Sequence, residues 1–273
     1  MWMRVLNASA EQITLHVKME IKANEIISIM MSMGDERQRE ILMRFFKTGK
    51  GEYGEGDNFL GIKVPDTRIV VKEARLSVPF DEIEKLLKSE WHEVRLCGFL
   101  LLVEEMKAAL PKARQAATAN AQRREEIAQF YLRHARMANN WDLVDMSCPK
   151  ILGKWLLYPQ ADGNMPDRSV LYRLAESSNL WEQRIAMVTC WMLIRADQFD
   201  DTLRLATLLL NHPHDLIHKA VGWMLREVGK RNMATLEDFL SEHLHQMHRT
   251  TLRYAIEKMS EGKRKFYLAS PRP

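Results

Sequence analysis

The chain has few of the features that mark extracellular or membrane proteins. It contains only three cysteines, Cys97, Cys148 and Cys190, which are far apart and lie within apolar helical patterns. An odd number of widely spaced cysteines implies no disulfide framework, and buried thiols of this kind are typical of a reducing compartment. The sequence has no apolar run of about 18 residues and no basic N-terminal segment followed by a sufficient apolar stretch. We therefore expect a cytoplasmic protein with no membrane partner.

The common motifs for nucleotide, metal and nucleophile chemistry are also missing. The glycine-rich stretch 48–57 lacks the order of a phosphate-cradling P-loop and does not follow a strand pattern. No Gly-x-Ser-x-Gly elbow occurs. Six of the nine histidines fall between His212 and His248, and His214 and His218 are spaced to share a zinc ion, but no HExxH glutamate or nearby cysteine completes a site. We predict no metal and no cofactor.

Size and charge set broad limits. With 273 residues, of which 46% are hydrophobic, the chain can bury a large core as one extended domain or two compact ones. Lysine and arginine number 40 against 36 aspartate and glutamate, which gives a net charge of +4. Such a balance permits a nucleic-acid partner only if the basic surface is local.

Apolar residues recur at helical spacing along nearly the whole chain, whereas alternating strand-type runs are scarce. The sequence therefore predicts an all-α protein whose helices form antiparallel pairs joined by short loops. The expected helices are 9–33, 35–47, 65–76, 79–89, 91–109, 121–135, 140–157, 167–177, 180–196, 199–211, 215–230, 233–246 and 249–260.

Five of these helices open alike, with a polar or capping residue, then an apolar one, then a charged residue about one turn in. The charged residues are Arg95, Asp145, Arg184, Lys219 and Arg253, at successive spacings of 50, 39, 35 and 34. This irregular period is near that of HEAT or armadillo-like repeats, which pair two helices per unit. We expect one solenoid domain over 1–273, with these charges and several tryptophans along its concave wall.

The segment 139–145, NNWDLVD, is the most informative in the chain. An asparagine is a good helix N-cap, and a helix that starts here places Trp141 and Asp145 one turn apart on one face. An indole offers a cation its π face, and a carboxylate stabilises developing positive charge. This pair suits a damaged, cationic nucleic acid.

Two later helices repeat the arrangement. Trp181 and Arg184 are three residues apart, and Lys219 and Trp223 are four apart. An arginine at such a position can clamp a phosphate. The alternative is that most of these tryptophans are core residues on amphipathic helices, as buried aromatics commonly are.

Several segments, in order, resemble the AlkD-type DNA alkylation repair proteins: 45–57, 59–65, 140–145, 180–184 and 218–227. The resemblance runs from about Phe45 to Lys265. It implies a HEAT-like solenoid whose concave groove holds double-stranded DNA. Active members of the family are monofunctional glycosylases that release N3- and N7-alkylated purines.

The resemblance also implies residue roles. Asp145 becomes the catalytic carboxylate, Trp141 and Trp223 the indoles that cradle the damaged nucleotide, and Arg184 a clamp on the phosphate backbone. Further candidates for DNA contact, taken from the repeated helix openings, are Trp181, Lys219, Arg95 and Arg253.

The chemistry agrees with these roles. An alkylated purine is already positively charged, so it leaves as a neutral base without a general acid, and one carboxylate suffices to stabilise the charge that moves to the sugar. We expect a monomeric alkylpurine DNA glycosylase of base excision repair that acts in the cytoplasm on chromosomal DNA. A catalytically inactive DNA-binding relative and a HEAT-type protein-interaction scaffold remain alternatives.

Overall fold

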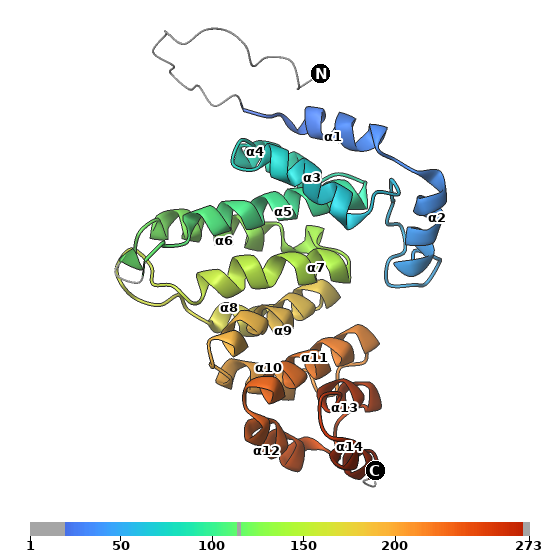
Figure 1. Cartoon of the computed structure of the whole chain (residues 1–273), viewed down its shortest axis with the longest axis vertical. Coiled ribbons are helices and arrows are strands. Elements are labelled where there is room, and N and C mark those ends of the chain that lie inside the picture. The colour runs from blue at the N-terminus through green and yellow to red at the C-terminus, as the bar shows by residue number, and fades with distance from the viewer. Residues whose placement is uncertain (1–19, 114–115, 270–273) are drawn as a thin grey trace.

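The computed structural model describes residues 20–113 and 116–269, and this part of the chain is helical with no strand, which confirms the all-α prediction (Figure 1). Of the first expected helix, 9–33, residues 9–19 lie outside the described residues, and residues 20–22 are not helical. The helices are α1 (Ala23–Ser32), α2 (Glu36–Phe45), α3 (Val64–Ala74), α4 (Phe80–Leu87), α5 (His92–Ala109), α6 (Ala121–Arg133), α7 (Trp141–Cys148), α8 (Ser169–Ala175), α9 (Leu180–Arg195), α10 (Asp200–Leu208), α11 (Asp215–Arg231), α12 (Met233–His243), α13 (Arg249–Ala255) and α14 (Glu261–Ala269).

The helices follow one another along the long axis of the molecule, from α1 at one end to α14 at the other (Figure 1). Neighbours in the chain pack as pairs, among them α4 with α5, α8 with α9 and α11 with α12. Five helices also pack on each other in succession, α5 on α7, α7 on α9, α9 on α11 and α11 on α13. The five helices singled out by their openings are therefore consecutive neighbours in a helical repeat.

Side-chain caps fix where several of these helices begin. The Asn140 side chain accepts a hydrogen bond from the Trp141 backbone N–H, and the Asn179 side chain accepts from the first turn of α9. His214 and His248 act in the same way at the starts of α11 and α13. Because a cap satisfies an otherwise unpaired N–H, each sets the first turn that carries a candidate site residue.

The structure also differs from the expected set of helices in two other places. The expected helix 140–157 is not α-helical throughout, since α7 ends at Cys148, a π-helical turn, Pro149–Gly153, follows, and α-helical residues continue from there to Trp155. Proline has no backbone N–H and cannot continue the α-helical ladder, so the register shifts there. Helix α14 was not expected; it has no fully buried residue, and only Tyr267 and Leu268 pack partly buried against the core.

The buried apolar side chains form one cluster that extends from Ala23 in α1 to Met259 after α13. The three cysteines are free and buried, and burial raises the pKa of the Cys97 and Cys190 thiols to about 12. They are therefore unreactive core residues. No described helix has the length and apolar character needed to cross a membrane.

The segment 46–63 between α2 and α3 contains the glycine-rich stretch, and we call it the glycine-rich loop. It is fixed by a buried carboxylate of α5. Both Glu93 carboxylate oxygens accept backbone N–H groups, those of Leu60, Gly61 and Ile62, at 2.9, 2.9 and 3.0 Å. Gly61 has a φ of +87°, and a Cβ there would clash with the carbonyl oxygen of Asp35. This loop therefore packs rigidly beside α7 and brings aromatic side chains to it.

Candidate functional site

An apolar cavity of about 410 Å³ opens where the glycine-rich loop meets α5 and the start of α7. Asp142 and Asp145 are the α7 carboxylates in its wall, and the aromatic residues around them are Phe45, Phe46, Phe59 and Trp141. We call it the aromatic cavity. The structure thus brings Trp141 and Asp145 to one apolar site, as their spacing on one helix face predicts.

Trp141 is held by phenylalanines at the junction of α2 and the glycine-rich loop. The Phe46 ring stacks on the indole with centroids 5.3 Å apart, and the exposed Phe45 ring meets it edge-on at 5.8 Å. Phe46 in turn stacks on the buried Phe59 at 5.1 Å. Since aromatic pairs of this kind add to burial energy, the indole orientation is fixed before any ligand arrives.

Asp145 and Arg184 form a two-pronged ion pair between α7 and α9. Arg184 Nε donates to Asp145 Oδ1 at 2.9 Å, and Nη2 donates to Oδ2 at 2.7 Å. The Asp145 side chain is 16% exposed and that of Arg184 is 6% exposed. Burial raises the pKa of Asp145 above its ordinary value, and the Arg184 charge and hydrogen bonds oppose this rise.

The remaining terminal nitrogen of Arg184 is also engaged, because Nη1 donates to the backbone carbonyl of Leu216 at 2.7 Å. Each side-chain nitrogen of Arg184 therefore donates within the protein. This placement favours a role in holding Asp145 over the expected role as a phosphate clamp. The sequence singled out both residues at the openings of consecutive helices, but it did not predict that they pair.

Behind the aromatic cavity lies a buried charge network that the sequence did not reveal. His92 contacts Asp57 through Nδ1 at 2.8 Å and Asp142 through Nε2 at 2.9 Å. Burial alone would lower the pKa of His92, but the two carboxylates outweigh it and raise this pKa to about 9. His92 is therefore a buried cation at neutral pH, and it ties the loop to α5 and α7.

Arg95 belongs to the same network. It is buried, its Nη2 donates to Asp57, and its Nη1 donates to the carbonyl oxygens of Ser89 and Glu90, each at 2.9 Å. These contacts favour a structural role for Arg95 over the expected contact with DNA.

The other expected residues lie further along the row of helices. Trp181 is buried, and Lys219 pairs with Asp215 at 2.8 Å. Trp223 is partly buried and packs against Trp191 with ring centroids 6.0 Å apart. Arg253 is exposed on α13. The structure thus joins Trp141, Asp145 and Arg184 in one site, while Trp223 lies in a separate aromatic contact.

Tyr53 is a site residue that the sequence did not single out. It comes from the glycine-rich loop, and its ring meets Trp181 edge-on at 6.2 Å and His214 at 6.4 Å. Burial raises its pKa, while a hydrogen bond from Trp141 and the charge of Lys219 oppose the rise. The loop therefore reaches the openings of α7, α9 and α11.

His214 and His218, whose spacing would allow a shared zinc ion, form no such group in the described residues, and His214 Nδ1 caps α11 instead. Asp215, His218 and His248 place one ligand atom each within 4.8 Å of one another. However, the rings of His218 and His248 are stacked at 16°, so their in-plane nitrogens do not point toward a common ion. Asp215 already pairs with Lys219. This group therefore does not favour a metal, and a metal-free site stays a prediction.

Comparisons with known proteins agree with the fold. A family model described as DNA alkylation repair enzyme matches residues 26–259. The structure is similar to that of an Enterococcus faecalis protein described as a predicted DNA alkylation repair enzyme, with a TM-score of 0.58 and 17% sequence identity. The match covers 84% of this chain and 97% of that chain, and at this identity the likeness concerns the fold. No curated protein matches the chain.

Proposed function

The chain belongs to the DNA alkylation repair enzyme family, and from this premise we propose that it hydrolyses the N-glycosidic bond of cationic N3- and N7-alkylated purines in double-stranded DNA. The observation that carries the proposal is the Asp145 carboxylate, which lines an aromatic cavity and is held by Arg184. The proposed enzyme is a monofunctional glycosylase that acts as a monomer in base excision repair.

Release of a cationic base requires no general acid from the protein. An N3- or N7-alkylated purine carries a positive charge, so cleavage of its glycosidic bond releases a neutral base and leaves positive charge on the sugar. The Asp145 carboxylate would stabilise that charge, and it would act strongly because it sits in an apolar wall. Trp141 would present its indole to the cationic nucleotide.

The whole chain would form one domain, a HEAT-like solenoid. Its concave groove would be lined by the consecutive helices α5, α7, α9, α11 and α13, and the DNA would lie in that groove. Lys219 and Arg253 lie on the later helices of this row, where they would contact the backbone. Trp223 would serve as the second indole beside the damaged nucleotide, and its partial burial leaves part of the ring accessible.

The proposal is tested by incubating the protein with methylated double-stranded DNA in excess EDTA and separating free bases by chromatography. We expect release of 7-methylguanine and 3-methyladenine without a metal. Tight DNA binding with no release would instead identify a non-catalytic DNA-binding relative. If neither binding nor release occurs, the chain is better explained as a protein-interaction scaffold.

The Asp145–Arg184 pair predicts a shift in pH dependence. Ionised Asp145 is the active form, so activity falls as pH drops through its pKa. Arg184→Gln removes a charge that lowers this pKa, so the carboxylate protonates at higher pH. The variant should lose about tenfold more single-turnover activity at acidic pH than at alkaline pH, because each pKa unit is a factor of ten in protonation.

Arg184→Lys is the matched control, since it keeps the positive charge and should keep an acidic limb close to that of the original protein. A different result would arise if Arg184 clamps a phosphate. Arg184→Gln would then lose activity equally at all pH values. The log–log slope of its DNA affinity against salt concentration would be shallower by about one, the value for one lost phosphate contact. That outcome would reject the positioning role.

A further inference from the structure

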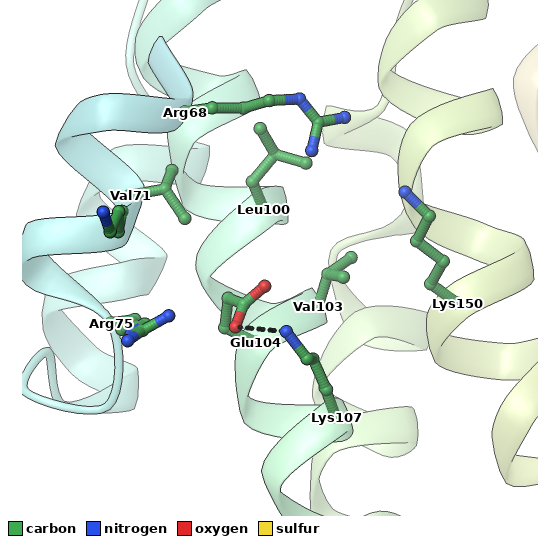
Figure 2. A pocket seen from close by; sticks show the side chains of 9 residues that line it. Arg68, Val71, Arg75, Leu100, Val103, Glu104, Lys107 and Lys150 are labelled. Carbon is green, nitrogen blue, oxygen red and sulfur yellow. Dashed lines mark hydrogen bonds and ion pairs between the residues drawn. The ribbon is translucent and has the colours of Figure 1, made fainter. Parts of the chain in front are cut away.

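A second cavity, of about 390 Å³, lies between α3, α5 and the π-helical turn after α7 (Figure 2). Its wall carries five cationic side chains and one carboxylate. The cations are Arg68, Lys72, Arg75, Lys107 and Lys150, and the carboxylate is Glu104. We call it the basic cavity.

Helical geometry gathers these charges from three elements. Arg68 and Lys72 are four residues apart on one face of α3, and Arg75 follows directly after the last residue of that helix. Val71 and Leu100 contribute an apolar floor, and Lys150 projects toward the same space from the opposite wall (Figure 2). The π-helical turn that begins at Pro149 sets the position of Lys150.

The cations of this cavity are largely unpaired. Glu104 accepts from Lys107 at 3.4 Å, whereas within residues 20–113 and 116–269 none of the other four cations forms an ion pair. Partial burial, and then the nearby charge of Arg68, lower the pKa of Lys150. Five positive charges around a single carboxylate repel one another, and a bound anion would relieve that repulsion.

The basic cavity adjoins the aromatic cavity. The Arg68 guanidinium lies 3.9 Å from the Met146 sulfur, and Met146 lines the aromatic cavity next to Asp145. Lys150 follows Met146 by four residues. A polyanion whose reacting unit faces Asp145 would therefore pass close to Arg68 and Lys150.

We propose that the basic cavity binds a backbone phosphate of the DNA strand that carries the lesion, with Arg68 and Lys150 as its principal contacts. This inference rests on the proposed function. It assigns backbone binding to residues whose charges are unpaired, in place of Arg184, whose nitrogens donate to Asp145 and Leu216. Arginine can bind a phosphate through two parallel hydrogen bonds, and lysine supplies a compact point charge.

The test is binding of a fluorescent unmodified duplex, measured by anisotropy over a series of salt concentrations. The double variant Arg68→Gln/Lys150→Gln should bind about tenfold or more weakly, and its log–log salt slope should be shallower by about two. The matched control is Lys112→Gln/Arg133→Gln, which removes two charges outside the cavity and should leave the slope unchanged. Thermal melting of each variant checks that it is folded.

Glu104→Gln provides a test in the opposite direction. It removes the one carboxylate of the cavity, so it should tighten duplex binding by about threefold and leave the number of phosphate contacts unchanged. A merely structural role for these residues predicts no gain of affinity.

The outcomes separate this proposal from the proposed function. If the original protein binds the duplex but the double variant keeps its salt slope, the basic cavity does not contact DNA and this inference is overturned. If the original protein does not bind DNA, both fail. Titration with inorganic phosphate alone tests whether the ligand is a free phosphate compound. Submillimolar phosphate binding that Lys150→Gln abolishes, while the same variant keeps its DNA binding, would assign the cavity to such a compound and would also overturn the proposal.

Discussion

Replacing Asp145 with asparagine is expected to slow base release by about two or more orders of magnitude, as loss of a key electrostatic stabiliser commonly does. Asparagine is nearly isosteric, and its amide oxygen can still accept a hydrogen bond from Arg184. What it lacks is the negative charge that offsets positive charge on the sugar. Single-turnover release of 7-methylguanine at saturating protein measures this loss directly.

The affinity of Asp145→Asn for the damaged duplex should remain largely intact, because the proposed role of Asp145 is in the chemical step. Asp142→Asn is the matched control, since Asp142 is also an α7 carboxylate in the aromatic cavity, but its Oδ2 is bound to His92. That variant should lose stability and far less of the release rate. Undiminished release by Asp145→Asn would remove Asp145 from the mechanism.

Replacing His92 with asparagine should lower the free energy of unfolding by about 3 to 5 kcal/mol, the usual cost of leaving buried charges without their partner. His92 bridges Asp57 and Asp142 and is almost fully buried. Urea unfolding at neutral pH measures the change. The control His134→Asn removes a hydrogen bond to the Phe130 carbonyl and the 3.2 Å contact of Nε2 with the partly exposed Glu84, and it should cost about 1 to 2 kcal/mol.

The same network predicts how stability varies with pH. The pKa of His92 is about 9 in the folded protein, against about 6.5 in an unfolded chain. Protonation of His92 therefore stabilises the fold fully below pH 6.5, and this contribution, roughly 3 kcal/mol, is lost as pH rises through about 9. His92→Asn should flatten that decline. An equally steep decline in the variant would show that another group causes it.

The sequence predicted the fold class well because helical periodicity recurs along the chain and helix caps such as Asn140 and Asn179 act locally. It missed the π-helical turn after Cys148, although Pro149 is a local signal that could have indicated it. Rules that act on neighbouring residues therefore account for the predicted helices and could also have predicted the π-helical turn.

Pairings between distant segments could not be predicted in the same way. Trp141 and Asp145 share a helix, so their spacing placed them together. Asp57 and His92 are 35 residues apart, and only the packing of the glycine-rich loop on α5 brings them into contact. The ion pair with Asp145 likewise gave Arg184 a partner that a charged residue at a helix opening does not specify by itself.

The central claim is that Asp145 acts on a bond already weakened by the positive charge of the lesion, with no general acid for the leaving base. The most direct test compares single-turnover release of 7-methylguanine with that of uracil and hypoxanthine from the same duplex at the same salt. We predict release of the cationic base alone, because neutral bases gain nothing from the indole or the carboxylate. Comparable release of a neutral base would require a general acid and would contradict this mechanism.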